Sequence, residues 1–303
     1  MTVTEQTSAA ADAALTSQDS AYLRLLGAQV RFYQGQKYRT RVIEAGHGEP
    51  LILLHGIGGH AETYIRNVVP LAQHFRVLSM DFLWHGFSDR PTFDGKTIPT
   101  FVDQILDLMD AAGISAANVE GESMGGWVAV WLALEHPERV RKLILNTIAG
   151  LRKPGEGTQA APGLAERSMA AIRNPTRETI RKRMEWLVAE PSRMPAEMVE
   201  IRYRIYNDPE INKALEQVFQ AHLVETAVHD RYDFSPADLA RIKAPSLVLW
   251  TEHNPGAGPD VGQFIADTIP GARFAVMGDC GHWPQFENQA DHDRIVSEFL
   301  LGK

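Results

Sequence analysis

The chain has 303 residues, 44% hydrophobic and 22% charged, a composition typical of a globular protein with one large domain and an insertion, or with two domains. Its 38 acidic and 30 basic residues give a formal charge of −8 without a basic cluster, which excludes a nucleic-acid partner. No apolar run approaches about 18 residues, which excludes a membrane span, and the single cysteine, Cys280, excludes an internal disulfide and fits a cytoplasmic protein.

Residues 1–27 are predicted to form a mobile tail followed by a short helix. Residues 1–18 contain few large apolar side chains and lack the basic and apolar segments of a signal peptide. The short helix is expected within residues 20–26. Two strands are predicted next, at 29–33 and 38–45, and the alternation of the second predicts an edge hairpin with one solvent-facing side.

From Pro50 onwards, short apolar runs alternate with helical patterns. Such runs are typical of strands buried on both faces of a parallel sheet. The predicted strands are 51–54, 76–81, 117–121, 142–145, 246–250 and 272–277, and the predicted helices are 97–112, 124–135 and 287–300. Alternation with short connections predicts an α/β core, formed by residues 28–149 and 236–303, whose mostly parallel sheet has helices on both faces.

The alternation stops between residues 150 and 235. Four helical patterns occupy this stretch, at about 162–173, 176–189, 195–206 and 209–225, and it contains no convincing strand. A helical insertion over the carboxyl ends of the strands would shape a pocket and exclude water. Residues 150–235 are therefore predicted to be a lid.

The candidate nucleophile is Ser123, in the pentapeptide Gly121-Glu122-Ser123-Met124-Gly125. The pentapeptide joins a predicted strand to a predicted helix, and such a sharp turn exposes a serine hydroxyl. The backbone N–H of Met124 would then be one donor to an oxyanion, and Ile57 in the glycine-rich loop after residues 51–54 would supply the other. That loop lacks the spacing of a phosphate-binding motif.

A serine needs a base, and His282 is the strongest candidate among the eleven histidines. It lies in a loop after the strand predicted at 272–277, which places it at the same edge of the sheet as Ser123. No metal-ligand spacing is present, so neither a metal nor another cofactor is expected.

The sequence resembles the α/β-hydrolase family over roughly residues 28–302. The resemblance is carried by the following segments: His55-Gly56, Asp81…His85-Gly86-Phe87-Ser88-Asp89, Gly121–Gly126, His136–Val140 and Gly281-His282-Trp283. The order serine, acid, histidine is also the order in that family. The resemblance implies the α/β-hydrolase fold with a helical lid.

Within the family, the chain is most similar to the meta-cleavage-product hydrolases. Two segments indicate this, Cys280–Glu287 and Glu197–Tyr203. The resemblance implies cleavage of a carbon–carbon bond in a 2-hydroxy-6-oxo-hexa-2,4-dienoate. It also implies that Arg202 binds the substrate carboxylate and that Trp283 lines the pocket, although an exposed lid arginine and a core tryptophan are the plain alternatives.

Three positions depart from the pattern of this subfamily. The family places an aspartate four residues after the tryptophan at 250, and here that position is Asn254, whose amide oxygen can hold His282 but cannot neutralise its charge. Asn254 is the predicted triad member, with Glu252 or Asp260 as alternatives, or with an aspartate that has been replaced. Glu122 stands where asparagine is usual, and Ile57 is not followed by the usual Gly-Pro.

Three functions therefore remain open. The first is a serine-dependent C–C bond hydrolase that gives a 2-hydroxypenta-2,4-dienoate and a carboxylic acid, with Ser123, His282 and Asn254 as the triad. The second is a carboxylesterase or lactonase acting on small esters. The third is a non-catalytic binding protein on this fold. The expected partner is a small-molecule substrate, and the sequence leaves a homodimer or a higher homo-oligomer open.

Overall fold

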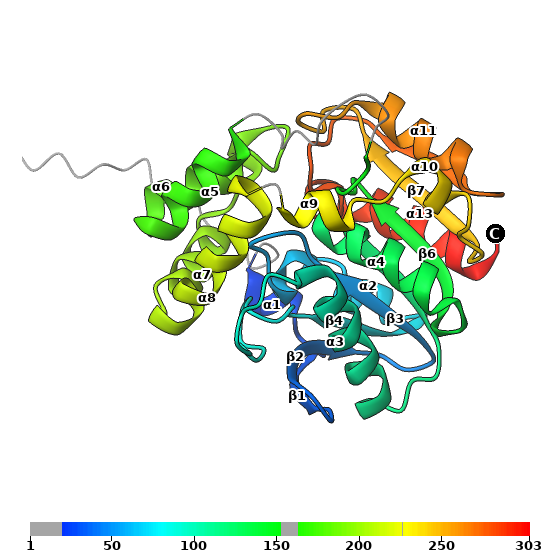
Figure 1. The fold of residues 1–303 in the computed structure, drawn as a ribbon, viewed down its shortest axis with the longest axis horizontal. Helices are drawn as coiled ribbons and strands as arrows, with labels where there is room; N and C mark the ends of the chain where they lie inside the picture. Colours follow the sequence, from blue (N-terminus) through cyan, green and yellow to red (C-terminus); the bar gives the residue numbers. More distant parts are fainter. Residues whose placement is uncertain (1–19, 153–162, 226) are drawn as a thin grey trace, which may run out of the picture.

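The computed structural model describes residues 20–152, 163–225 and 227–303, and an eight-stranded sheet forms its centre (Figure 1). The tail predicted at residues 1–18 lies outside the described residues. The strands are β1 (Gln29–Gln34), β2 (Arg39–Ala45), β3 (Glu49–Leu54), β4 (Phe75–Met80), β5 (Ala117–Glu122), β6 (Val140–Asn146), β7 (Ser246–Thr251) and β8 (Arg273–Met277).

The strand order is β1-β2-β4-β3-β5-β6-β7-β8. Strand β2 runs antiparallel to β1 and to β4, and every later pairing is parallel. The carboxyl ends of β3, β5, β6, β7 and β8 therefore meet at one edge of the sheet, where an open α/β sheet binds its ligands.

Helices cover both faces of this sheet, which explains the continuous apolar runs of its strands. In β3, Ile52 and Leu54 pack in one buried cluster and Leu51 and Leu53 pack in another. The helices of the first cluster are α3 (Thr97–Ala111), α4 (Met124–Glu135) and α11 (Pro259–Thr268), and those of the second are α2 (Val68–Leu71) and α13 (Gln289–Leu301). The predicted fold class, a mostly parallel sheet with helices on both faces, is confirmed by this arrangement.

The hairpin at the start of the sheet differs from the prediction. Strand β1 is the edge and exposes Val30 and Phe32, whereas β2 lies between β1 and β4. Val42 and Ile43 of β2 point to opposite faces and are both fully buried. The solvent-facing side predicted for the second strand is therefore wrong, because helices pack on both sides of it.

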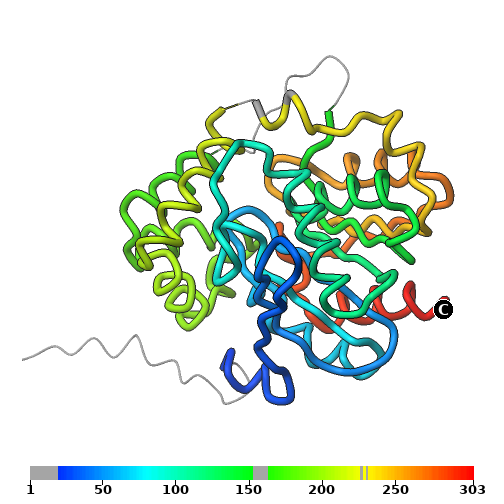
Figure 2. Tube along the Cα trace, turned by 60° about the horizontal axis from the view of Figure 1, so that its bottom comes forward, coloured from blue at the N-terminus to red at the C-terminus, as the bar shows by residue number. Residues whose placement is uncertain are grey.

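The first helices after β6 gather in a group beside the sheet in both views (Figures 1 and 2). They are α5 (Leu164–Arg173), α6 (Arg177–Glu185), α7 (Ala196–Tyr206) and α8 (Pro209–Phe219), followed by a π-helical turn (Gln220–Val224), α9 (Ala227–Tyr232) and α10 (Pro236–Leu239). Helix α6 ends four residues before its predicted end. We call α5–α8 the lid helices.

Contacts join this helical group to the loops at the carboxyl edge of the sheet. The Tyr206 hydroxyl donates to the Gly58 carbonyl at 2.8 Å, and the Trp283 N–H donates to the Leu187 carbonyl at 3.0 Å. The lid is thus bonded directly to the loop after β3 and to the loop that carries His282. Short elements complete the fold: α1 (Ala21–Arg24), α12 (Pro284–Glu287) and 3₁₀ turns at Ala61–Tyr64, Pro137–Arg139 and Pro191–Arg193.

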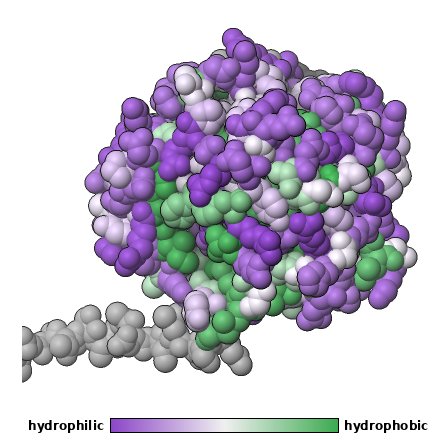
Figure 3. Space-filling view, turned by 90° about the horizontal axis from the view of Figure 1, so that it is seen from below, coloured by the Kyte–Doolittle hydropathy of each residue, from purple (hydrophilic) through white to green (hydrophobic). Residues whose placement is uncertain are grey.

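Helix α1 contacts the lid through its first residue, since the Ala21 N–H donates to Glu197 of α7 at 2.8 Å. Tyr22 and Leu26 remain exposed. Figure 3 shows hydrophobic side chains reaching the surface among hydrophilic ones on the face seen from below.

Within the described residues, no helix combines the length and the apolar character needed to cross a bilayer.

Candidate active site

Ser123 stands alone between β5 and α4 in a backbone conformation that side chains rarely adopt. Its φ is 54° and its ψ is −118°. The glycines on either side make this turn possible, because a Cβ on Gly121 would overlap the carbonyl of Gly125, and a Cβ on Gly125 would overlap the carbonyl of Leu54. A strained serine held by its surroundings is typical of a functional position.

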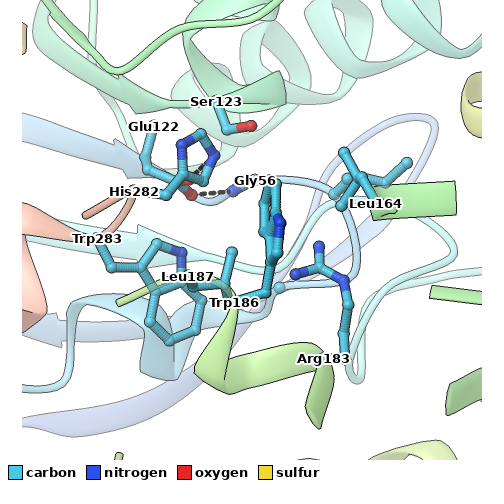
Figure 4. Close-up of a pocket in the computed structure, with 11 residues that line it drawn as sticks. Gly56, Glu122, Ser123, Leu164, Arg183, Trp186, Leu187, His282 and Trp283 are labelled. Carbon is cyan, nitrogen blue, oxygen red and sulfur yellow. Dashed lines mark hydrogen bonds and ion pairs between the residues drawn. The ribbon is translucent and has the colours of Figure 1, made fainter. Parts of the chain in front are cut away.

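A pocket opens in front of this serine (Figure 4). It is lined by Gly56, Ile57, Gly59, Glu122, Ser123, Leu164, Arg183, Trp186, Leu187, His282 and Trp283. The structure thus brings four predicted site residues together: Ser123, His282, Ile57 and Trp283. Met124 is the first residue of α4, and the first N–H groups of a helix have no partner within the helix.

His282 is held by Asn254. The Nδ1 atom of His282 lies 2.7 Å from Oδ1 of Asn254, and the Asn254 amide nitrogen donates to the Ala257 carbonyl at 3.0 Å. The second bond fixes the amide so that its oxygen faces the imidazole, and Nδ1 therefore carries the proton. Neither alternative acid takes this place in the described part of the chain: Glu252 is exposed beside Asp279, and Asp260 is exposed in the first turn of α11.

Glu122 occupies the other side of the imidazole. One of its carboxylate oxygens lies 3.1 Å from Nε2 of His282, and the other accepts the Gly56 N–H at 2.7 Å (Figure 4). Among the described residues, Nε2 contacts Glu122, and no hydrogen bond joins it to the Ser123 hydroxyl. Sequence reasoning noted Glu122 as a departure from the family pattern and missed this contact. The sequence contained a signal for this contact: an acid, Glu122, stands directly before the nucleophile in a chain that has Asn254 where the family has an aspartate.

Two arginines from the lid are buried near this pocket, and sequence reasoning named one of them. Arg202 is 1% exposed and Arg183 is 3% exposed. Nε and Nη2 of Arg202 and Nη1 of Arg183 are buried without a hydrogen-bond partner, while Nε of Arg183 donates to Ser168 at 2.8 Å. Such atoms in a buried cation are costly to leave unpaired, which favours an anionic ligand beside them.

The two arginines differ in position. Arg183 lines the pocket, and Figure 4 shows its guanidinium directed toward the space between Trp186 and Leu164. Arg202 is not among the residues that line the pocket. Its guanidinium carbon lies 5.2 Å from the ring centre of Trp283, which does line the pocket. Burial lowers the pKa of Arg183 to about 10, so its guanidinium stays protonated at neutral pH.

Other reactive side chains nearby have structural roles. Burial lowers the pKa of the His55 imidazole well below its usual range, and its two nitrogens contact the Gly56 carbonyl and the Phe82 N–H. Burial raises the pKa of the Cys280 thiol to about 12, which leaves it unreactive at neutral pH. Within the described ranges, no cluster of three His, Cys, Asp or Glu side chains could hold a metal ion.

The α/β-hydrolase-fold family matches residues 49–289, and this chain belongs to that family and is a hydrolase. The 2-hydroxymuconate semialdehyde hydrolase of Pseudomonas sp. (strain CF600) is 30% identical over 266 residues, which is 86% of this chain and 90% of that protein. The 2-hydroxy-6-oxononadienedioate/2-hydroxy-6-oxononatrienedioate hydrolase of Burkholderia vietnamiensis (strain G4 / LMG 22486) is 32% identical over 271 residues, which is 88% of this chain and 92% of that protein.

A solved structure agrees with these relatives. The 2-hydroxy-6-oxo-6-phenylhexa-2,4-dienoate hydrolase of Rhodococcus sp. strain RHA1 superposes with a TM-score of 0.80 at 27% identity, covering 90% of this chain and 99% of that one. The predicted fold and the similarity to meta-cleavage-product hydrolases are both confirmed.

Proposed function

We propose that this hydrolase cleaves the C5–C6 bond of a 2-hydroxy-6-oxo-2,4-dienoate, a meta-cleavage product of aromatic catabolism. The products are a 2-hydroxypenta-2,4-dienoate and a carboxylic acid. The observation that carries the proposal is that Ser123 and His282 share one pocket with Arg183 in its wall and Arg202 behind Trp283, both buried and both with unpaired N–H donors. The names of the curated relatives support it, because each is a hydrolase of such a dienoate.

In this proposal the lid arginines bind the substrate carboxylate. Arg202 takes the anchoring role, since a planar guanidinium with two unpaired N–H donors matches a carboxylate bidentately. Arg183 adds a second positive charge at the pocket wall. Trp283 packs beside the Arg202 guanidinium and forms the adjoining wall.

The reaction begins with a proton shift. His282 assists transfer of the proton from the 2-hydroxyl group to C5, and the resulting 2-oxo group can accept the electron pair that C5 gains when the C5–C6 bond breaks. Ser123 attacks the C6 carbonyl and gives up its proton to His282, and water then hydrolyses the acyl group from Ser123; alternatively, Ser123 positions a water that attacks C6 directly and gives up its proton to His282. In both routes the departing dienolate is protonated at its 2-oxygen, and one water is consumed. The N–H groups of Ile57 and Met124 stabilise the oxyanion that forms on the C6 oxygen.

The test compares two substrate classes. Ring-fission dienoates are yellow, so their cleavage is followed as a loss of absorbance, and nitrophenyl esters report ester hydrolysis. We expect kcat/KM for at least one dienoate to exceed that for the esters. Preference for esters or lactones with no dienoate cleavage would replace the proposal with a carboxylesterase or lactonase. If a fluorophosphonate never labels Ser123 of the wild-type protein, the result would indicate a non-catalytic binding protein.

A further inference from the structure

The imidazole of His282 lacks the anionic partner that a Ser-His-Asp triad provides. Oδ1 of Asn254 accepts a hydrogen bond from Nδ1–H at an Nδ1–Oδ1 distance of 2.7 Å, which fixes the tautomer, but the amide carries no charge. When Nε2 takes the proton of Ser123, the ring becomes a cation whose side chain is only 12% exposed. An uncompensated cation at such a site raises the energy of the transition state.

A carboxylate is already in place on the opposite side of the ring. Glu122 presents one oxygen to Nε2 at 3.1 Å, and its side chain is 1% exposed. The Gly56 N–H holds the other oxygen at 2.7 Å, so the carboxylate is oriented before the reaction starts. Because both groups are withdrawn from water, their electrostatic interaction is stronger than it would be at the surface.

Glu122 also discriminates between the two charge states of His282. A neutral imidazole gains little from the Glu122 carboxylate, whose oxygen lies 3.1 Å from Nε2 without a hydrogen bond between the two. A protonated imidazole is a cation at the same distance, and the carboxylate attracts it. An interaction that favours the charged ring over the neutral one lowers the barrier to proton transfer from Ser123.

Another buried acid near His282 is committed elsewhere. Glu287 accepts the N–H groups of Gly281 and Ala189 at 2.6 and 2.7 Å, and Arg193 lies 3.6 Å away. Its carboxylate shapes the backbone of the His282 loop and does not contact the ring.

We propose that Glu122 is a positioning residue that supplies the negative charge missing from Asn254, so that the role of one triad aspartate is divided between two side chains. In the reaction, the Ser123 O–H bond breaks, its proton passes to Nε2, and the serine oxygen bonds to the carbonyl carbon as the carbonyl electrons move to oxygen. The imidazolium then lies between Asn254 at Nδ1 and Glu122 at Nε2. The proposal rests on the Ser123–His282 chemistry proposed above and is independent of which bond is cleaved.

The test is a double-mutant cycle between Glu122→Gln and Asn254→Asp. Glutamine keeps an oxygen for the Gly56 N–H, removes the charge and places an uncharged NH2 group beside Nε2. We expect Glu122→Gln alone to lower kcat by about 10- to 100-fold, and by less than about threefold once Asn254→Asp provides a carboxylate at Nδ1. Equal losses in the two backgrounds would overturn the proposal, because a purely structural role does not depend on the charge at residue 254.

A second readout separates this proposal from the choice of substrate. The rate of Ser123 phosphonylation by a fluorophosphonate also needs His282, and it should follow the same cycle. If no dienoate is cleaved but the labelling rates are non-additive as expected, the proposed function fails and the role of Glu122 stands. If dienoates are cleaved and the cycle is additive, the proposed function stands and the proposed role of Glu122 fails.

The matched control is Glu120→Gln, on the same strand. Glu120 is equally buried, but its carboxylate contacts His292 at 2.8 Å. The effect of Glu120→Gln on kcat should be the same whether residue 254 is Asn or Asp. Glu122→Asp, which keeps the charge, should recover part of the rate lost in Glu122→Gln, and a Glu122→Asp variant as slow as Glu122→Gln would count against a charge effect.

Discussion

At the scale of single residues, the site holds two positive charges from the lid and one negative charge beside the base. Arg183 and Arg202 are buried with unpaired N–H donors, and Glu122 contacts His282. Buried charges of this kind are retained when a ligand or a reaction uses them. We propose that the arginines bind the substrate carboxylate and that Glu122 stabilises the imidazolium.

Removing the arginine proposed to bind the substrate carboxylate should lower kcat/KM for a dienoate and leave kcat/KM for a neutral ester nearly unchanged. Arg202→Ala should cost about 2–3 kcal/mol of transition-state stabilisation, or roughly 30- to 160-fold in kcat/KM, for the dienoate. Parallel kinetics on a neutral nitrophenyl ester provide the control and should change by less than about threefold. A variant that cleaves the dienoate at the wild-type kcat/KM would show that Arg202 is not the anchor, and Arg183→Ala would then be expected to carry the loss.

Residue identities were predictable wherever a local pattern fixes the geometry. Ser123 is predicted by its pentapeptide and His282 by its position after a strand, whereas Asn254 was predicted from the resemblance to the family, with Glu252 and Asp260 as alternatives. Glu122 and Arg183 were not predictable in their roles, because each depends on a distance between segments far apart in the chain. The Glu122–His282 contact spans 160 residues and exists only after the sheet and the loop have folded.

At the scale of elements, the turn between β5 and α4 depends on close backbone packing. A Cβ at Gly125 would meet the backbone carbonyls of Leu54 and His55, which lie at the end of β3 and cannot move as a flexible side chain would. The turn that exposes Ser123 is therefore locked against the neighbouring strand.

Gly125→Ala should consequently destabilise the protein by about 1–3 kcal/mol, because the turn must shift to relieve the overlap. Gly278→Ala is the matched control, since a Cβ there would meet only the Glu252 side chain at an ordinary 3.6 Å. Denaturant unfolding measures the stability of each variant, and fluorophosphonate labelling measures the exposure of Ser123. Wild-type stability and labelling in Gly125→Ala would contradict the tight packing.

The positions of elements were predicted better than their environments. The alternation after Pro50 located the parallel strands, since doubly covered strands read as apolar runs. The two buried faces of β2 were not foreseen, because its sequence alternates like a half-exposed strand. The early end of α6 at Glu185 was missed for a similar reason, as the next residues pack on the His282 loop and are shaped by it.

At the scale of the whole molecule, a buried polar network ties the sheet to the C-terminal helix. His292 of α13 is fully buried between Glu120 of β5 at 2.8 Å and Asp293 at 2.9 Å. Burial alone lowers the pKa of this imidazole, but the two carboxylates outweigh burial and raise it to about 10. His292 is therefore a cation at neutral pH and part of what holds the two elements together.

The stability contributed by His292 should depend on pH in a defined direction. Its folded-state pKa lies above the usual value of about 6.5, so the contribution is complete below that pH and disappears as pH rises toward 10. His292→Gln should lower the free energy of unfolding by about 3–5 kcal/mol at pH 6 and by progressively less up to pH 10. Urea unfolding of both proteins across this range measures the difference. A difference that stays constant with pH would contradict a charged His292.

The proposed function requires that Ser123 and the lid arginines act together on a C–C bond. The most direct measurement is product analysis during turnover of a ring-fission dienoate by the wild-type protein and by Ser123→Ala. We expect equal amounts of a 2-hydroxypenta-2,4-dienoate and a carboxylic acid from the wild type, and a rate at least about 10³-fold lower from the variant. Unchanged dienoate in the presence of a fluorophosphonate-reactive wild-type protein would contradict the proposed function.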